Sequence, residues 1–481
     1  MNPIVFRKTI SFVEDGYSGN MADVERFVEE LGFDCNVEIP LSVMRRLPAA
    51  LRAERREISA VIAHLDNKIK ILDFNTKNIY GLAVDLGSTN IWGRIIDLEN
   101  SSEIAGAVTA NPQRAYGADI LSRIFYAMEH GSGEIHKATL DGINNLISKL
   151  CDMAKISQND IYAVTVGANT TMMHFFLNLP VENIPVAPYT PVVHSTGFFT
   201  AIGTCLNINT EGVVYLFPNV GSYVGGDIIS GILFSGIYKN KGIGILIDMG
   251  TNVEIAIGSE DWILAGAGAG GPALDEGIAA AGKTAHDGAI VDVSIDENSL
   301  IPSVDTLSGA PAVSICGSGM VSLISELYKN GIIDRMGKLI PGKFGVFRAE
   351  TENAYALTES LNIYQHEIEN FLLSKGAMAT LLKTLVGSIG LDFSEIESII
   401  LTGAIGNSVN LGHALSIGFL PCLTNEKFHL IRNASLSGAA LLLNDITLIK
   451  DISHISSIIT YKEMNEDRDF MRELPGAVFM P

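Results

Sequence analysis

The sequence predicts an α/β protein of two similar lobes, and a duplicated turn is the main reason. The first copy, YGLAVDLGSTNIWGRII, has two apolar, strand-like runs around Asp85, Gly87, Ser88, Thr89 and Asn90. The second copy, IGILIDMGTNVEIAI, has the same plan around Asp248, Gly250, Thr251 and Asn252. Amphipathic helical segments and a further apolar strand follow each copy, so the strand–helix pattern repeats as well.

The residue types in both turns suit a bound phosphate. Glycine allows a tight turn that brings backbone N–H groups close to an anion, and the neighbouring hydroxyls add donors. The carboxylates of Asp85 and Asp248 can hold a hydrated divalent cation beside a polyphosphate. One such turn is weak evidence, because Asp-x-Gly also forms ordinary hairpins. Two copies predict paired phosphate loops facing each other across a cleft, with both aspartates as catalytic and metal-side residues.

Length and pattern divide the chain into three parts. A chain of 481 residues exceeds one ordinary domain. Residues 1–78 are expected to form a small α/β module or linker, with an amphipathic helix at ADVERFVEELGF and a hairpin at ISAVIAHLDNKIKILDF. Residues 79–237 form the first predicted lobe. Residues 238–481 form the second, with a C-terminal tail packed onto a lobe.

Composition excludes several classes of function. The formal net charge of −21 argues against a nucleic-acid partner. The N-terminus has no apolar signal region, and no apolar run is long enough to span a bilayer, so no membrane role is expected. The five scattered cysteines include no C-x-x-C pair, which predicts neither a zinc site nor an iron–sulfur cluster. We therefore expect a soluble, cytoplasmic protein.

Three further glycine clusters lie at strand–helix boundaries. In LTGAIGN the residues of interest are Gly403, Ala404, Gly406 and Asn407. Small residues here either let an adenine or ribose approach the backbone or only allow the helix to pack closely on the strand. ICGSGM opens a helix whose N–H groups attract oxygens, at Gly317, Ser318 and Gly319. Its Cys316 is expected to be a small buried residue rather than a nucleophile. AGAGAGGPALDEG, with Gly270 and Gly271, is either a flexible clamp or a crowded turn between lobes.

The residues that could act as acid or base are less clearly indicated by the sequence than the two turns. Asp119 and Asp227 are the remaining predicted catalytic residues, and Arg123 and Glu254 also lie within or just after glycine-rich turns. A structural ion pair is the commoner explanation for any one of them. His174 lies in an apolar run and is expected to be a satisfied core histidine, with a role as a metal ligand the minor alternative.

Two Asp-x-Gly turns and a late strand–Gly–helix motif resemble the superfamily of acetate and sugar kinases, heat-shock chaperones and actin. That resemblance implies two ribonuclease-H-like lobes (the actin-like ATPase fold) with a nucleotide cleft between them. It also implies that the turns grip the phosphates of Mg·ATP and that the late motif holds adenosine.

A narrower resemblance rests on longer segments. These are NPQRAYGADILSRI (Asn111–Ile124), VGANTTMMHFFLNLP (Val166–Pro180), APYTP (Ala187–Pro191), VGGDI (Val224–Ile228), GGPALDEG, ICGSGM and ILTGAIGN. In this order they are similar to the ATP-dependent reductive activators of corrinoid methyltransferase proteins. The resemblance implies an ATPase that drives reduction of a cobalt(II) corrinoid protein to cobalt(I), and a homodimer is compatible with it.

The chain departs from that family in one respect. Such activators normally carry an iron–sulfur domain, and this sequence has no clustered cysteines for one. It is then either a paralogue that takes electrons from a separate low-potential donor such as a ferredoxin, or a fragment. Two alternatives use the same fold. One is a sugar or acyl kinase in which Asp227 deprotonates the acceptor hydroxyl. The other is an interaction protein switched by nucleotide.

Overall fold

The computed structural model describes residues 2–12, 21–52, 57–66, 68–250, 252–268, 282, 286–403, 408–464 and 467–481. The chain divides into two compact units. Unit 1 holds Met1–Phe234 and Ser435–Ser457, and unit 2 holds Ser235–Ala434 and Ile458–Pro481. The observed boundary after Phe234 lies close to the one expected after residue 237. The segment 435–457, expected in the second lobe, belongs to unit 1.

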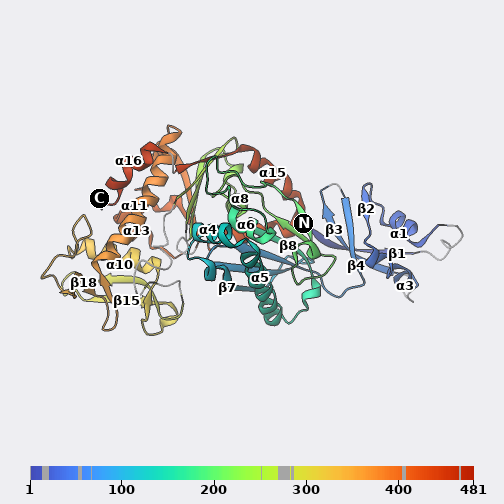
Figure 1. Cartoon of the computed structure of the whole chain (residues 1–481), viewed down its shortest axis with the longest axis horizontal. Coiled ribbons are helices and arrows are strands. Elements are labelled where there is room, and N and C mark those ends of the chain that lie inside the picture. The colour runs from blue at the N-terminus through green and yellow to red at the C-terminus, as the bar shows by residue number, and fades with distance from the viewer. Residues whose placement is uncertain are drawn as a thin grey trace. The chain divides into compact units, whose positions relative to one another are not determined.

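Unit 1 begins with a small α/β module (Figure 1). Its sheet has the order β1-β3-β4-β2, with β1 (Val5–Ser11), β2 (Asn36–Glu38), β3 (Glu57–Leu65) and β4 (Lys68–Phe74). Its helices are α1 (Asp23–Leu31), α2 (Leu41–Met44) and α3 (Leu47–Leu51). The predicted hairpin is confirmed as β3 and β4, and the predicted helix as α1, which buries Phe27 and Leu31 in the module's core.

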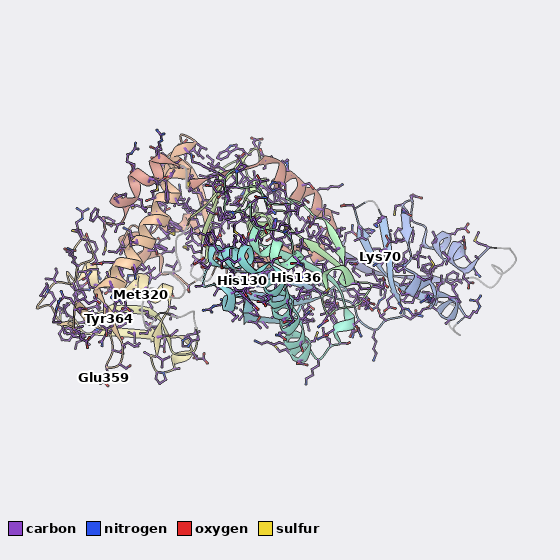
Figure 2. The ribbon with its side chains drawn as sticks, in the orientation of Figure 1. Lys70, His130, His136, Met320, Glu359 and Tyr364 are labelled. Atoms are coloured by element: carbon purple, nitrogen blue, oxygen red, sulfur yellow. The ribbon has the colours of Figure 1, made fainter. Side chains whose placement is uncertain are left out.

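A buried ion pair holds this module against the rest of unit 1. Lys70 on β4, labelled in Figure 2, is 4% exposed, and its ammonium lies 3.3 Å from the carboxylate of Glu211. It also donates to the Glu211 carbonyl oxygen at 2.9 Å. The hydroxyl of Tyr162 donates to Asp73 of the module, again at 2.9 Å. These bonds satisfy a cation that would otherwise be costly to bury.

The main sheet of unit 1 has the order β7-β6-β5-β8-β10-β9. Its strands are β5 (Tyr80–Leu86), β6 (Asn90–Asp97), β7 (Glu103–Ala110), β8 (Ile161–Ala168), β9 (Phe198–Thr200) and β10 (Val213–Leu216). The helices are α4 (Ile120–His130), α5 (Gly133–Ala154), α6 (Thr170–Leu177), α7 (Ala201–Thr204) and α8 (Gly226–Ser235). Strands β5, β6 and β7 are antiparallel neighbours, and β8 runs parallel to β5. Every residue of β8 is buried, as the continuous apolar run predicts for a strand covered on both faces.

Unit 2 repeats this connectivity in its own main sheet, ordered β21-β20-β11-β12-β13-β22. The strands are β11 (Ile243–Met249), β12 (Val253–Gly258), β13 (Ile263–Gly268), β20 (Ile396–Thr402), β21 (Phe428–Leu430) and β22 (Ile459–Lys462). Strands β11, β12 and β13 are antiparallel neighbours, and β20 runs parallel to β11. In each unit the duplicated turn therefore joins the first two strands of the sheet, which confirms the predicted two-lobe repeat.

Unit 2 also carries helices and small sheets outside its main sheet (Figure 1). The helices are α10 (Gly317–Lys329), α11 (Gln365–Ser388), α13 (Leu411–Ser416) and α16 (Arg468–Ala477). The small sheets contain β14 (Ala289–Ile295), β15 (Pro302–Thr306), β16 (Ser314–Ile315), β17 (Val346–Arg348), β18 (Asn353–Ala356) and β19 (Asn362–Tyr364). The C-terminal tail packs on this unit: Lys383 of α11 lies 2.8 Å from Glu473 of α16. Along the described part of the chain, no helix combines the length and apolar character needed to cross a membrane.

Helices α14 (Ala434–Asn444) and α15 (Ile449–Ile458) return the chain to unit 1. Helix α14 lies against β8, where Thr165 Oγ1 donates to the carbonyl oxygen of Ala439 at 2.7 Å. It also crosses α8 so closely that a Cβ at Gly438 would lie 1.9 Å from the carbonyl oxygen of Ser230. This close crossing ties the segment to unit 1, although it follows most of unit 2 in the sequence.

The close crossing of α14 and α8 predicts that two glycine-to-alanine substitutions affect the stability of the protein differently. Gly438→Ala should lower the melting temperature, because overpacking a close contact costs about 1–3 kcal/mol. Gly387→Ala, on the exposed end of α11 where an added Cβ meets nothing within 4 Å, should leave stability unchanged or raise it by about 0.5–1 kcal/mol. Differential scanning calorimetry compares the two. Equal melting temperatures would contradict the close crossing.

Candidate functional site

The first duplicated turn is a tight connection between β5 and β6. Leu86 and Ile91 are the last paired residues, which leaves Gly87, Ser88, Thr89 and Asn90 at the turn, all partly buried. A Cβ at Gly87 would lie 2.7 Å from the carbonyl oxygen of Asn90, so the turn requires glycine there. Asp85 lies on β5 one residue before the end of the strand. The predicted geometry of this turn is confirmed.

The structure brings Asp85 and Asp227 into one polar cluster. Ser435 Oγ donates to Asp85 Oδ1 at 2.9 Å and lies 3.3 Å from Ser230 Oγ. Ser230 Oγ in turn donates to the carbonyl oxygen of Asp227 at 2.9 Å. Burial, together with the negative charge of Asp85, raises the pKa of Asp227 to about 7. The two carboxylates therefore lie in the same region of unit 1, where the charge on one makes ionisation of the other less favourable.

A glycine on the neighbouring strand makes room for this cluster. Gly167 of β8 is the direct partner of Asp85 in the sheet. A Cβ at Gly167 would lie 2.5 Å from Ser435 Oγ and 2.9 Å from Ser230 Oγ. Reasoning from the sequence missed these three residues. A signal was present in the sequence, because V-G-A-N at 166–169, which begins on β8, parallels T-G-A-I-G-N at 402–407, which begins at the last residue of β20.

The second turn repeats the arrangement with a different acidic neighbour. The N–H of Gly250 donates to the carbonyl oxygen of Asn252 at 3.0 Å, and Asn252 is partly buried. Asp248 pairs directly with Glu254 across β11 and β12, so both carboxylates project from the same face of the sheet. Glu254 is buried.

The late glycine motif begins beside Asp248. Gly403 has φ +89°, and a Cβ there would lie 2.4 Å from Asp248 Oδ1. Both facts require glycine, because any side chain would strain the backbone and displace the carboxylate. Four other predicted residues of the second lobe, Thr251, Ala404, Gly406 and Asn407, lie outside the described residues, as do Gly270 and Gly271 of the glycine-dense run.

Several predicted site residues have structural roles that the sequence did not distinguish. Asp119 is the exposed N-cap of α4 and accepts a hydrogen bond from the N–H of Ser122 at 2.8 Å. Its neighbour Arg123 is buried and donates to the carbonyl oxygen of Ser88 in the first turn at 2.7 Å. The cap accounts for the carboxylate of Asp119, and its catalytic role stays a prediction.

The ICGSGM motif packs α10 against β14. Gly317, Ser318 and Gly319 are buried at the start of the helix, and a Cβ at Gly319 would lie 2.4 Å from the carbonyl oxygen of Ile290. Cys316 is buried as expected, with its Sγ 3.2 Å from the same carbonyl oxygen. Close packing explains Gly319, and a contact of the motif with nucleotide stays a prediction.

His174 is the satisfied core histidine that the apolar run predicts. Its Nδ1 lies 2.7 Å from the carbonyl oxygen of Thr170, and its Nε2 accepts from the N–H of Val192 at 3.0 Å. Burial lowers the pKa of this imidazole, which favours the neutral form. Both ring nitrogens are used, so this side chain offers no nitrogen to a metal.

Models of one protein family match almost the whole chain in three consecutive segments. The RACo linker region matches residues 1–79, the RACo middle region matches residues 80–240, and the C-terminal ASKHA domain of RACo matches residues 242–481. The first two segments correspond to the small module and to the first lobe. The third covers unit 2 together with residues 435–457, which belong to unit 1. The match to the ASKHA domain confirms the predicted actin-like ATPase fold.

Individual relatives agree with these models. The chain is 30% identical over 427 residues to the corrinoid activation enzyme RamQ of Eubacterium limosum, covering 84% of this chain and 71% of RamQ. It is 23% identical over 414 residues to a reductase of the Co(II) methylated amine-specific corrinoid protein of Methanosarcina barkeri, covering 79% of this chain and 73% of that protein. A solved reductive activator for a corrinoid, iron–sulfur protein superposes with a TM-score of 0.93 at 31% identity, covering 100% of this chain and 79% of the other. The chain therefore belongs to the RACo family of reductive activators, enzymes that activate corrinoid proteins.

Proposed function

We propose that this protein couples binding and hydrolysis of Mg·ATP to reduction of a cobalt(II) corrinoid protein of a methyltransferase system to the cobalt(I) state. The electron would come from a separate low-potential donor such as a ferredoxin, because the sequence offers no clustered cysteines for an iron–sulfur centre. The observation that supports nucleotide chemistry best is the carboxylate cluster at the first turn, where Asp85 and Asp227 interact.

The donor set around Asp85 fits a magnesium ion. Mg²⁺ in nucleotide sites is commonly held by one or two carboxylates, with waters and substrate phosphates completing the coordination. Two carboxylates that repel each other, as the raised pKa of Asp227 indicates, gain from a divalent cation beside them. Asp85 would hold the hydrated ion, with Asp248 serving as the metal-side carboxylate of the second turn. When bound, Mg²⁺ would neutralise phosphate charge during transfer.

The other residues of the turns would bind and orient the phosphates. In the first turn these are the backbone and side chains of Gly87, Ser88, Thr89 and Asn90, and in the second Gly250, Thr251 and Asn252. The motif that begins at Gly403 would accept adenosine. Coupling to reduction then requires that ATP bind one state of the activator–corrinoid complex more tightly than the other, because a ligand shifts an equilibrium only by its differential affinity.

A kinase reaction is the second candidate, and Asp227 favours it. A carboxyl group whose pKa is near 7 is suited to remove a proton from an acceptor hydroxyl. Rates of ATP turnover distinguish the two functions. An activator should turn over ATP faster with a cobalt(II) corrinoid protein present, whereas a kinase should respond to a sugar or acyl acceptor.

Removing either turn aspartate should impair nucleotide binding. Asp85→Ala or Asp248→Ala should weaken Mg·ATP binding about ten- to a hundredfold, because a charge-assisted contact contributes roughly 1.5–3 kcal/mol. Isothermal titration calorimetry and phosphate release measure the loss. Asp392→Ala is the control, because that exposed aspartate only caps a short turn in unit 2. Normal binding and hydrolysis by both turn variants would rule out the proposed phosphate site.

The raised pKa of Asp227 predicts a pH-dependent stability in metal-free buffer. An aspartate in the unfolded chain loses its proton near pH 4, whereas folded Asp227 keeps it to about pH 7. Across this window the folded state binds more protons, so wild-type stability falls as the pH rises. The Asp227→Asn variant has no carboxyl group at this position, so it does not lose stability in this way as the pH rises. Its melting temperature relative to wild type should therefore increase from pH 5 to pH 8, and a constant difference would contradict the shift.

ATP alone should not produce cobalt(I), because ATP hydrolysis supplies no electron. With a chemical reductant or reduced ferredoxin, cobalt(I) should accumulate only when ATP is also present. The visible spectrum of the corrinoid protein reports the oxidation state directly. The Asp85→Ala variant serves as the matched control for nucleotide-dependent reduction. An equal rate of reduction with and without ATP, across several corrinoid proteins, would favour the kinase instead.

A further inference from the structure

The first turn is held from outside by hydrogen bonds to three successive carbonyl oxygens. The carbonyl oxygen of Gly87 accepts from Asn111 Nδ2 at 2.8 Å, and that of Ser88 accepts from Arg123 Nη1 at 2.7 Å. The carbonyl oxygen of Thr89 accepts from the backbone N–H of Asn111 at 2.8 Å. Two residues, one after β7 and one on α4, thus fix the whole turn.

These bonds determine which way the peptide groups of the turn face. In a planar trans peptide the N–H points opposite to the carbonyl oxygen. Because the carbonyl oxygens of Gly87 and Ser88 point toward Asn111 and Arg123, the N–H groups of Ser88 and Thr89 point away from them. A turn whose N–H groups share one orientation in advance loses less free energy on binding an anion than one that must reorganise.

Both holding residues are themselves fixed. Asn111 and Arg123 are 1% and 0% exposed. Asn111 Oδ1 accepts from the N–H of Gln113 at 3.0 Å, and Arg123 Nε donates to the carbonyl oxygen of Gly117 at 3.0 Å. Gln113 is also buried, and its Nε2 donates at 2.6 Å to Thr139 on α5. The network therefore joins the turn to α4 and α5, the helices of His130 and His136, which Figure 2 labels.

Arg123 is an unfavourable side chain to enclose. Burial lowers the pKa of its guanidinium to about 10, so the side chain stays charged at neutral pH although it is fully enclosed. Among the described residues its second terminal nitrogen, Nη2, has no hydrogen-bond partner, and no carboxylate lies within ion-pair distance. A buried donor without a partner is unfavourable, and so would be an apolar side chain here, because the carbonyl oxygens of Ser88 and Gly117 would lose these donors. The cost of enclosing the guanidinium is therefore incurred where it holds the turn.

We propose that Asn111 and Arg123 are positioning residues for the phosphates of ATP, acting through the backbone of the first turn without touching the nucleotide. This inference rests on the proposed function, because it assigns a role at the same nucleotide site. It also gives a physical reason for the segment NPQRAYGADILSR, whose first and last residues are the two that hold the turn.

The test compares two ligands that differ only in their phosphates. Asn111→Asp keeps the shape of the side chain and the acceptor for Gln113, but it replaces the donor to Gly87 with a second acceptor. Arg123→Met removes the donors to Ser88 and Gly117. Equilibrium dialysis should show about tenfold weaker binding of Mg·ATP by each variant, with the affinity for adenosine unchanged.

Matched controls separate positioning from a general loss of structure. Asn410→Asp makes the same change at a distant asparagine, the N-cap of α13 in unit 2. Lys375→Met removes another buried cation that donates to backbone carbonyl oxygens, in this case those of the C-terminal segment. Lys375→Met should lower the melting temperature as Arg123→Met does, and both controls should bind Mg·ATP and adenosine as wild type does.

The outcomes are distinguishable. A selective loss of Mg·ATP affinity in Asn111→Asp and Arg123→Met supports the positioning role. Unchanged Mg·ATP affinity in the folded variants, or an equal loss for both ligands, overturns it while leaving the proposed function intact. If Arg123→Met does not fold, Asn111→Asp decides together with Asn111→Leu, which removes the donor to Gly87 without adding a charge. Failure of the wild-type protein to bind Mg·ATP overturns the proposed function and this inference together.

Discussion

The fixed backbone of the first turn is the constraint on which the rest of unit 1 depends. A turn of glycine and small polar residues has many conformations in isolation, and only bonds from outside select one of them. Asn111 and Arg123 supply these bonds to the carbonyl oxygens of Gly87, Ser88 and Thr89. Because β5 and β6 both end at this turn, its geometry also sets the position of Asp85 and thus the centre of the carboxylate cluster.

The end of the sequence contributes to the same cluster. Ser435, which donates to Asp85, is the second residue of α14 and follows most of unit 2 in the chain. The residue before it, Ala434, donates its N–H to Thr402 Oγ1 at 2.9 Å within unit 2. Residues 435–457 belong to unit 1 because their first bonds and their packing are there.

Local pattern was sufficient to predict the elements of the sheets but not the long-range bonds between them. The two Asp-x-Gly turns, the strands around them and most helices follow from hydrophobic period and turn chemistry, which are local properties. Ser435 could not be connected to Asp85 in this way, because nothing in a serine on an apolar helix identifies a partner 350 positions away. Asp119 illustrates a residue with two interpretations. An aspartate before a helix is often an N-cap, and this simpler explanation accounts for its carboxylate.

The duplication includes a feature beyond the two turns. In each unit a glycine from the parallel neighbouring segment lies beside the aspartate. Gly167 on β8 pairs with Asp85, and Gly403, the residue directly after β20, lies next to Asp248. The shared requirement is space around a carboxylate, which only a residue without a side chain provides.

The two copies use that space differently. Hydroxyl groups of Ser230 and Ser435 occupy it in unit 1, whereas in unit 2 the Asp248 carboxylate itself lies against Gly403. The acidic neighbours also differ, since Asp227 comes from the start of a helix and Glu254 from the adjacent strand. Burial and the negative charge of Asp85 raise the pKa of Asp227, beside the first copy, to about 7. The two turns are therefore alike in framework, while the groups described around the two aspartates differ.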